Sequence, residues 1–223
     1  MAVSQAQADW FVARNLCRAS KVMTIRSCVD LSPFRAIPST IGPLRTFAAI
    51  GRLDRQKGFD RLIEAFKSIP NPDFALHIYG QGDQEAALRD LAEGDSRIVF
   101  KGFAATPTAA YENIDAVIMP SRWEAYGLVA IEALSAGRAL LCADTDGMRD
   151  HAKLGARMLK DPSLSGLRAE LDRIAALGHE MPASPCRFSD RLERDFAAGW
   201  RNVAALAKVQ PELGLQPVAG GRA

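Results

Sequence analysis

Short runs of apolar and β-branched residues alternate along most of the chain with stretches in which apolar residues recur every three or four positions. The first pattern predicts buried strands, and the second predicts amphipathic helices. The predicted strands are Thr46–Ile50, Phe74–Gly80, Arg97–Gly102, Asp115–Pro120, Ala139–Asp144 and the less regular Ala156–Lys160. The helices predicted between them are Phe59–Ile69, Asp83–Leu91, Pro107–Glu112, Tyr126–Ala136 and Gly147–Lys153. Five strand-to-helix steps in succession predict an α/β fold, a parallel sheet flanked by helices.

Both ends of the chain lie outside this alternation. Residues 1–45 combine a helix-like start, a strand-like KVMTI and an irregular stretch whose prolines are typical of a linker. Toward the other end, Leu164–Leu177 and Arg191–Lys208 have amphipathic helical patterns. The sequence therefore predicts an N-terminal extension with a linker at 1–45, a sheet domain at 46–180, an amphipathic helix within 181–210, and a disordered tail at 211–223.

Composition and charge narrow the classes of partner. The chain has 223 residues, of which 48% are hydrophobic and 24% charged, which is ordinary for a globular protein with one main core. The net charge is +2, and cations are scattered among acids, so the charge pattern does not indicate a nucleic-acid-binding protein. No stretch of 18 uncharged apolar residues occurs, and the N-terminus lacks the apolar core of a secretion signal. Peripheral contact with the inner face of a membrane stays open.

The cysteines and histidines do not indicate a metal site or a disulfide framework. The four cysteines lack CxxC spacing, and Cys142 lies in an apolar strand-like run, which favours buried, reduced thiols and a cytoplasmic location. His77 lies within a predicted strand, and His151 and His179 show no ligand spacing. We expect core or surface roles for these histidines.

In open parallel sheets, ligands bind beyond the carboxyl ends of the strands, so the loops there are candidate sites. The first loop, GRLDRQKGFD, carries Arg52 and Lys57 between a strand that ends near Gly51 and a helix that starts near Gly58. A flexible glycine, two cations and a helix N-terminus favour an anion such as a phosphate. The alternative is a turn that carries two solvated surface cations.

Two further loops carry weaker signals. The turn YGQGD, Tyr79–Asp83, has two glycines that permit a close approach to a ligand, but a lone GxG is weak evidence, and the pattern favours ordinary turn chemistry. The segment KGF, Lys101–Phe103, could place an aromatic edge or a backbone group near a base, but taken alone it favours a structural role.

The segment SRWEAYGLVAIEALSAG carries two carboxylates, Glu124 and Glu132, eight positions apart. A helix that begins near Tyr126 or Gly127 directs its first free amides, those of residues 127–129, toward the preceding loop, where a pyrophosphate would fit. Carboxylates accept hydrogen bonds and pair naturally with the adjacent hydroxyls of a sugar. Eight residues at helical rise span at most roughly 12 Å, about the reach from the ribose of a nucleoside diphosphate to an attached sugar. The alternative is a helix-entry acid followed by an ordinary solvated glutamate.

Several stretches together carry a family resemblance: GRLDRQKGFDRLIEAF, LHIYGQGDQEAALRDLA, RIVFKGF, SRWEAYGLVAIEALSAG and LLCADTDGMRD. In this order and spacing they resemble the C-terminal half of retaining GT-B glycosyltransferases of family 4, over roughly Leu44 to Asp150. Glu124 and Glu132 reproduce the E-x7-E signature of that family. VDLSPF near the start and FSDRLERDFAAGW near the end resemble it more weakly.

The resemblance implies one half of a GT-B fold, a Rossmann-like domain that binds a nucleotide-diphosphate sugar. Catalytic roles would fall to Arg52 and Lys57, which would hold the diphosphate, and to Glu124, which would orient the donor sugar. Glu132 would bind the ribose. The donor-binding set that the resemblance implies is Gly51, Gly102, Phe103, Tyr126, Gly127, Leu128, Val129 and Glu132. No metal or other cofactor is expected, because cations and the helix end would neutralise the phosphates.

Some positions depart from the family pattern: Ala125, Tyr126, Arg138, Ala139, Asp146 and Asp150. Complete members resemble two Rossmann-like domains, and residues 1–45 look like the closing segment of the other, acceptor-binding domain. The implied function is transfer of a sugar, with retention, to an acceptor such as a polysaccharide or glycolipid. The acceptor domain would come from a separate chain, and self-association is another way to cover the exposed face. The alternative function is a non-catalytic nucleotide-sugar-binding module or a truncated remnant.

Overall fold

The sheet has six strands, all parallel. The computed structural model describes residues 1–40, 42–177 and 189–209. The strands are β1 Thr46–Ile50, β2 Ala75–Tyr79, β3 Ile98–Gly102, β4 Ala116–Met119, β5 Ala139–Ala143 and β6 Arg157–Leu159. Their order across the sheet is β3-β2-β1-β4-β5-β6, so the direction of winding reverses between β1 and β4. The predicted α/β fold is confirmed, and each predicted strand agrees with the observed one to within a residue at either end.

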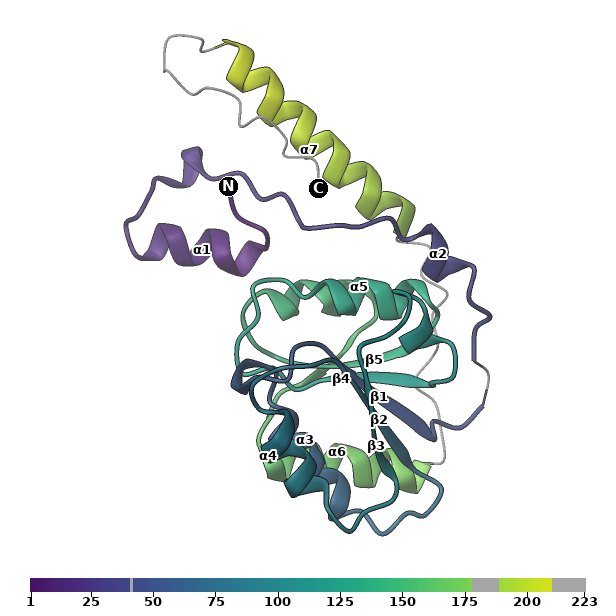
Figure 1. Ribbon diagram of the computed structural model, residues 1–223. Helices are drawn as coiled ribbons and strands as arrows, with labels where there is room; N and C mark the ends of the chain where they lie inside the picture. Colours follow the sequence, from purple (N-terminus) through teal and green to yellow (C-terminus); the bar gives the residue numbers. More distant parts are fainter. Residues whose placement is uncertain (41, 178–188, 210–223) are drawn as a thin grey trace.

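Helices cover both faces of the sheet (Figure 1). One face carries α3 Phe59–Lys67, α4 Glu85–Ala92 and α6 Leu164–Leu177, and the other carries α5 Leu128–Ser135 and α2 Ser32–Arg35. Side chains alternate between the two cores along the central strands β1, β4 and β5. On β1, Phe47 and Ala49 belong to the core under α3, whereas Ala48 belongs to the core under α5. Since both faces are covered, the central strands β4 and β5 are buried and apolar along their whole length.

Two of the predicted helices are 3-10 helices, η3 Ala109–Tyr111 and η4 Asp146–Leu154. In η3, the amide of Tyr111 donates to the carbonyl of Thr108 at 2.9 Å, three residues back. In η4, the amide of Gly147 donates to the carbonyl of Glu124 at 3.0 Å. A Cβ at Gly147 would lie 1.8 Å from the carbonyl oxygen of Ala125. The start of η4 is therefore hydrogen-bonded to, and packed against, the loop that contains Glu124, and it does not form a regular α-helical turn.

The N-terminal residues and the last described helix lie beyond α5, on the side away from the sheet (Figure 1). They form α1 Gln5–Ala13, η1 Ala19–Lys21 and α7 Ser189–Val209. Within the described ranges, the strand-like KVMTI forms only an isolated parallel bridge, Ala2 with Thr24, and no longer strand. The tail predicted at 211–223 lies outside the described residues.

Two contacts fix α7 against the extended N-terminal segment. A carboxylate oxygen of Glu193 accepts from the amide of Leu31 at 2.9 Å and from the guanidinium of Arg35 at 3.3 Å. Gly199 packs so closely on Ile25 that an added Cβ would lie 3.0 Å from its side chain. Of the helices within the described ranges, none has both the length and the apolar character needed to cross a bilayer.

Candidate functional site

A cavity of about 570 Å³ lies at the carboxyl ends of β1, β2 and β3. This volume is within the range of small-molecule sites. The lining residues are Ile50, Gly51, Arg52, Tyr79, Gly80, Gln81, Phe103, Ala104, Ala105, Thr106, Pro107, Ala110, Tyr111 and Glu132. Four residues expected from the sequence, Gly51, Arg52, Phe103 and Glu132, are therefore brought together here. Gly102 ends β3 with φ +69° beside them, and Phe103 is 79% exposed.

Part of the cavity floor is peptide backbone, where two glycines meet. Gly51 and Gly80 have φ +149° and +134°, a region that side-chain-bearing residues rarely adopt. A Cβ at Gly80 would lie 1.8 Å from the carbonyl oxygen of Gly51. Tyr79, Gly80 and Gln81 of the turn YGQGD all line the cavity, so this turn forms part of the candidate site.

Glu132 enters the cavity wall from the second turn of α5 and is held there by a tyrosine. The hydroxyl of Tyr111 donates to Glu132 Oε2 at 2.6 Å. Burial raises the pKa of Glu132, and the hydrogen bond from Tyr111 opposes this rise. The pKa of Tyr111 lies well above its usual value because its hydroxyl is buried and faces that carboxylate. Glu132 is therefore partly buried and partnered, which contradicts the alternative of an ordinary solvated glutamate. The sequence pattern did not single out Tyr111.

A buried arginine supports Tyr111 from behind. Arg138 is 1% exposed, and its Nε donates to the carbonyl of Tyr111 at 2.7 Å. A second guanidinium nitrogen donates to the carbonyl of Pro38 at 3.0 Å, in the segment that precedes β1. Burial lowers the pKa of Arg138. Arg138, one of the departures from the family pattern, thus joins the linker segment to the residue that positions Glu132.

Lys57 and Glu124 form an ion pair at the point where the winding of the sheet reverses. Lys57 Nζ lies 2.5 Å from Glu124 Oε2, and the two side chains are 14% and 12% exposed. Lys57 ends η2 Arg55–Lys57, and its backbone amide donates to the carboxylate of Asp54 at 3.2 Å. A Cβ at Gly51 would lie 3.2 Å from the lysine stem, so the glycine leaves room for it. Lys57 is therefore not a solvated surface cation.

Arg52 differs from Lys57 in its surroundings. Its side chain is 74% exposed, and a guanidinium nitrogen lies 3.2 Å from the carboxylate of Asp54. The guanidinium also donates to Gln56 Oε1 at 3.1 Å. Arg52 borders the cavity and is free to reorient toward an anion there, because exposed ion pairs of this kind contribute little stability.

The loop that carries Glu124 is anchored on both sides. Arg122 forms two hydrogen bonds with the carboxylate of Asp60, at 2.8 and 2.6 Å, which lower the pKa of Asp60. Gln56 Nε2 donates to the carbonyl of Trp123 at 2.9 Å. On the other side, the carbonyl of Glu124 accepts from the amide of Gly147. These contacts hold the loop fixed in front of α5.

Helix α5 begins at Leu128, one or two residues later than the sequence suggested. Gly127 caps it with φ +85°, and a Cβ there would lie 2.9 Å from Met148 Sδ. The amides of Leu128 and Val129 belong to the first turn, where no intrahelical acceptor exists. These two amides lie directly after the anchored loop. This is the place where the sequence pattern predicts an anion.

Tyr126 is the exception among the expected donor-binding residues. It is 2% exposed, its ring centroid lies 4.6 Å from that of His151, and burial raises the pKa of its hydroxyl. His151 Nε2–H donates to the carbonyl of Tyr126 at 2.5 Å, and burial lowers the pKa of this histidine. The resemblance implies a place for Tyr126 in the donor-binding set, but its side chain packs inward under the start of α5, so only its backbone lies near the loop.

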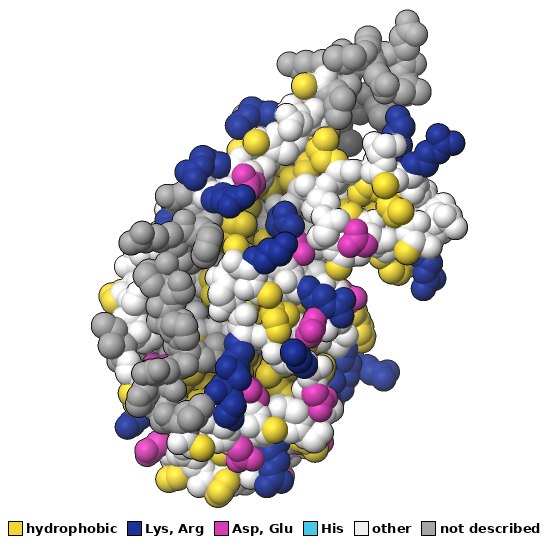
Figure 2. Space-filling model, turned by 180° about the vertical axis from the view of Figure 1, so that it is seen from behind, with side chains coloured by type: hydrophobic (Ala, Val, Ile, Leu, Met, Phe, Trp, Pro, Cys, Tyr) yellow, Lys and Arg dark blue, Asp and Glu magenta, His cyan; other side chains and the backbone are white. Residues whose placement is uncertain are grey.

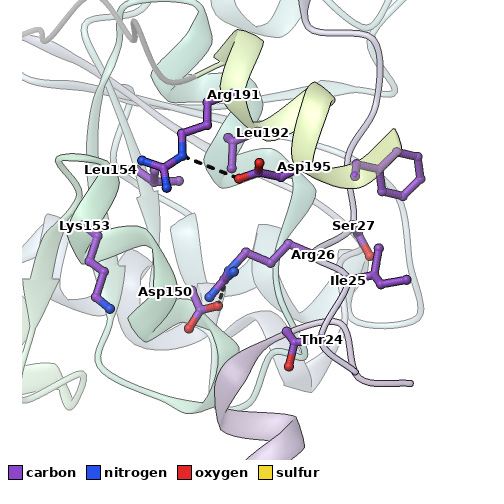
Figure 3. A pocket seen from close by; sticks show the side chains of 11 residues that line it. Thr24, Ile25, Arg26, Ser27, Asp150, Lys153, Leu154, Arg191, Leu192 and Asp195 are labelled. Atoms are coloured by element: carbon purple, nitrogen blue, oxygen red, sulfur yellow. Dashed lines mark hydrogen bonds and ion pairs between the residues drawn. The ribbon is translucent and has the colours of Figure 1, made fainter. Parts of the chain in front are cut away.

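A second cavity, of about 300 Å³, lies between the extended N-terminal segment, η4 and α7 (Figure 3). There, Arg26 pairs with Asp150 at 2.6 Å, and Arg191 lies 3.6 Å from Asp195. None of the expected site residues lines it. Over the described parts of the chain, no group of three or more His, Cys, Asp or Glu side chains is placed to hold a metal ion. Cys17, Cys28 and Cys142 are free thiols, and only Cys142 is fully buried.

Comparison with curated proteins finds glycosyltransferases. The chain is 29% identical to a glycogen synthase of Mycobacterium tuberculosis over 200 residues, which are 83% of this chain and 47% of that protein. It is 34% identical to an uncharacterized glycosyltransferase of Methanocaldococcus jannaschii over 110 residues, 47% of this chain and 28% of that protein. The matched part thus spans less than half the length of each of these relatives.

Comparison with solved structures identifies the same fold. A lipopolysaccharide outer core galactosyltransferase, WaaB, superimposes with a TM-score of 0.75 at 19% identity, over 93% of this chain and 61% of that one. Anabaena HepE, solved in complex with UDP and glucose, gives 0.73 at 18% identity, over 93% and 62%. The expected half of a GT-B fold is therefore confirmed.

A family model described as glycosyl transferases group 1 matches residues 35–176. The match includes the whole sheet, both carboxylates of the E-x7-E signature and the two cations of the first loop. It covers well over half of the 223 residues. The chain therefore belongs to the family of group 1 glycosyl transferases.

Proposed function

We propose that this chain is the donor-binding part of a retaining family 4 glycosyltransferase and holds a nucleotide-diphosphate sugar. The observation that carries the proposal is the convergence of two cations, two carboxylates and a helix N-terminus on one edge of the sheet. The structure of HepE with UDP and glucose supports a donor of this class.

Each group at this edge matches one part of such a donor. The cavity between the glycine floor and Phe103 suits a base and ribose, and Glu132 keeps an oxygen for the ribose hydroxyls while Tyr111 occupies the other. Lys57, Arg52 and the amides of the first turn of α5 would bind the linked phosphates and stabilise the charge that develops on the departing diphosphate. Because these groups are cationic or hydrogen-bond donors, the proposal needs no metal ion. Glu124, held by Lys57, would orient the transferred sugar.

Transfer itself would require an acceptor-binding domain. The chain covers 61% and 62% of the two structural neighbours named above, so a complete cleft has a further wall. In this proposal, the acceptor-binding domain is supplied by another polypeptide, by another part of the same polypeptide or by a second copy of this chain. Retention of configuration and a cytoplasmic location, which the reduced cysteines favour, belong to the same proposal.

The test is calorimetric titration of the purified chain with UDP, GDP and ADP. We expect saturable binding of at least one of them, and weaker binding by the Glu132→Ala variant. Glu64→Ala is the matched control, because Glu64 is an exposed acid on the outer face of α3. Absence of binding for all three nucleotides, in a chain shown to be folded by circular dichroism, would contradict the proposal.

A further inference from the structure

Arg138 differs from the other cations of the molecule in its surroundings. The face shown in Figure 2 carries many Lys and Arg side chains at its surface, several of them beside Asp or Glu. Arg138, in contrast, is 1% exposed, and of the Lys, Arg, Asp and Glu residues that the structure describes it alone is buried. None of the described carboxylates forms an ion pair with it. A buried charge without an ionic partner lowers stability, so any role of Arg138 lies in what its hydrogen bonds hold.

The guanidinium of Arg138 joins three segments that are far apart in the sequence. Arg138 itself follows α5, where its amide donates to the carbonyl of Ala133 at 2.9 Å. Its Nε donates to the carbonyl of Tyr111 in η3 at 2.7 Å, and its Nη2 donates to the carbonyl of Pro38 at 3.0 Å. Within the described ranges, Nη1 has no hydrogen-bond partner. Because a guanidinium is a rigid plane, it fixes the two carbonyls relative to each other and to the end of α5.

Tyr111 connects this fixed position to Glu132. The tyrosine hydroxyl donates to Glu132 Oε2 at 2.6 Å, while the tyrosine carbonyl accepts from Arg138. Glu132 lies on α5 and Arg138 lies just after its end, so Tyr111 is bonded to the same helix through both its side chain and its backbone. Hydrogen bonds weaken steeply when their geometry is distorted. A displacement of the Tyr111 backbone would therefore weaken the bond that holds the carboxylate.

The segment that precedes β1, residues 31–40, contacts Tyr111 by two routes, and we call it the linker segment. Pro38 is joined to Tyr111 through the guanidinium of Arg138. The ring of Phe34 packs edge-on against the tyrosine ring, with the centroids 5.3 Å apart and the planes at 84°. The linker segment is therefore held against both the backbone and the ring of the residue that positions Glu132.

Helix α7 and the turn after α5 hold the linker segment at its two ends. The carboxylate of Glu193 on α7 accepts from the amide of Leu31 at 2.9 Å. Ser39 lies so close to the turn after α5 that a Cβ added at Gly137 would be 2.6 Å from the serine Oγ. The contact between Glu193 and Leu31 also joins VDLSPF to the described part of FSDRLERDFAAGW, the two stretches that resemble the family only weakly. Both stretches thus lie on a continuous path of contacts that ends at Glu132.

We propose that Arg138 is a positioning residue that makes the direction of the Glu132 carboxylate depend on the position of the linker segment. The proposal rests on the proposed function, because it states how the affinity of that site for a nucleotide is set. A displaced linker segment would move Tyr111 by both of its contacts and weaken the hydrogen bond to Glu132. Coupling of this kind is reciprocal, so a nucleotide that binds Glu132 orders the linker segment in turn. The alternative is a purely structural cation that only complements the carboxyl end of α5.

The test follows the ionisation of Glu132 in the nucleotide-free, 223-residue chain by NMR of isotope-labelled glutamate carboxyl groups, assigned with Glu132→Gln. Burial raises the pKa of Glu132, and the hydrogen bond from Tyr111 lowers it. Arg138→Met should therefore raise this pKa, as Tyr111→Phe should. The double variant should raise it no further than Tyr111→Phe alone, because Arg138 acts through Tyr111. Arg138→Lys should cause a smaller rise, since a single ammonium cannot bridge both carbonyls.

Arg97→Met is the matched control. Arg97 is a partly buried arginine that also donates to backbone carbonyls, including those of Ile69 at 2.7 Å and Asn71 at 2.8 Å. It directly precedes β3, at the edge of the sheet opposite the cavity. Its loss should lower stability to urea and leave the pKa of Glu132 unchanged. An unchanged pKa in both Arg138 variants, or an equal rise in Arg97→Met, would overturn the proposal. If Arg138→Met does not fold, Arg138→Lys decides alone.

Hydrogen exchange in the wild-type chain tests the reciprocal effect. The amide of Ile37 in the linker segment donates to the carbonyl of Phe34 at 3.1 Å, and it should exchange more slowly in saturating UDP. The amide of Phe74, which donates to the carbonyl of Asn71 at 3.3 Å in the turn before β2, is the internal control and should not change. Bound UDP without any slowing at Ile37 would contradict the coupling to the linker segment.

Titration of the same proteins with UDP separates this proposal from the proposed function. Arg138→Met should lower UDP affinity about fivefold. If UDP, GDP and ADP all fail to bind while the pKa of Glu132 still depends on Arg138, the donor site is refuted and the positioning role stands. If UDP binds equally to the wild type and to Arg138→Met, and the pKa of Glu132 is the same in both, the positioning role is refuted and the donor site stands.

Discussion

The two signature carboxylates lie on either side of the same helix start, yet their surroundings differ. Glu124 lies before α5 and is paired with Lys57, a full positive charge at 2.5 Å. Glu132 lies inside α5 and is paired with the neutral hydroxyl of Tyr111 at 2.6 Å. A cationic partner neutralises the first acid and fixes its direction, whereas a hydroxyl fixes the second and leaves its negative charge for a ligand. The spacing places the two acids, and their partners determine what each can do.

The largest expected effect concerns the carboxylate whose charge is left for the ligand. Glu132→Ala removes the proposed acceptor for the ribose hydroxyls, so affinity for UDP should fall about 100-fold, which is about 2.7 kcal/mol. Glu124→Ala should change UDP affinity far less, because UDP lacks the sugar that Glu124 is expected to orient. Calorimetry on both variants beside Glu64→Ala measures the difference. Equal losses of UDP affinity in Glu132→Ala and Glu124→Ala would contradict the different roles proposed for the two carboxylates.

The next effect concerns the ion pair. Lys57→Met leaves Glu124 charged and only 12% exposed, so the free energy of unfolding should fall by about 2 kcal/mol, measured by urea denaturation. The double variant Lys57→Met with Glu124→Gln should recover most of that stability, because no unpaired charge remains. It should not recover UDP affinity, since the cation is still absent. If the single and double variants were equally unstable, Lys57 would act through packing rather than through charge.

A smaller and pH-dependent effect is expected from Tyr111→Phe. Burial raises the pKa of Glu132 and the tyrosine hydroxyl lowers it, so the variant should have a still higher pKa at Glu132. Ribose binding needs the ionised form. UDP affinity should therefore decline with falling pH in both proteins, and the decline should begin at a higher pH in the variant. The ionisation of UDP itself is common to the two titrations and cancels in their difference. Superimposable pH profiles would show that Tyr111 does not position Glu132.

The smallest effect is expected at Arg52, whose side chain is 74% exposed. Arg52→Ala should change the free energy of unfolding by less than about 0.5 kcal/mol, as exposed sites usually do. UDP affinity should fall about threefold at low salt and less at high salt, because a mobile, hydrated cation is easily screened. Titrations at two salt concentrations measure this. A loss as large as that of Glu132→Ala would mean that Arg52 becomes buried against the ligand.

Much of the fold was predictable because covered parallel strands must be apolar and their helices amphipathic. All six strands followed from that pattern, and the loops after them contained Gly51, Arg52 and Phe103 of the cavity, whereas Glu132 comes from α5. The 3-10 form of η3 and η4 was not predictable. It depends on contacts between distant segments, such as the bond from the amide of Gly147 to the carbonyl of Glu124.

The sequence did not reveal the partners of the site residues. Tyr111 lies in a short segment without any motif and reaches Glu132 only because η3 folds back against α5. Nothing in the sequence predicts the burial of Arg138, which is 1% exposed and donates hydrogen bonds to two backbone carbonyls. Tyr126 is the opposite case, because the resemblance implied a place for it in the donor-binding set, whereas its side chain belongs to the core.

The contact between Gly51 and Gly80 limits how the base preference of the proposed nucleotide site can change. Any side chain at Gly80 would collide with the backbone of the neighbouring strand end, so substitutions there cannot reshape the hollow without moving a strand. Substitutions that alter the choice of nucleotide in the proposed site are therefore expected at the rim of the cavity, at exposed positions such as Phe103 and Thr106. Engineering of donor choice should therefore randomise the rim and keep the paired glycines constant.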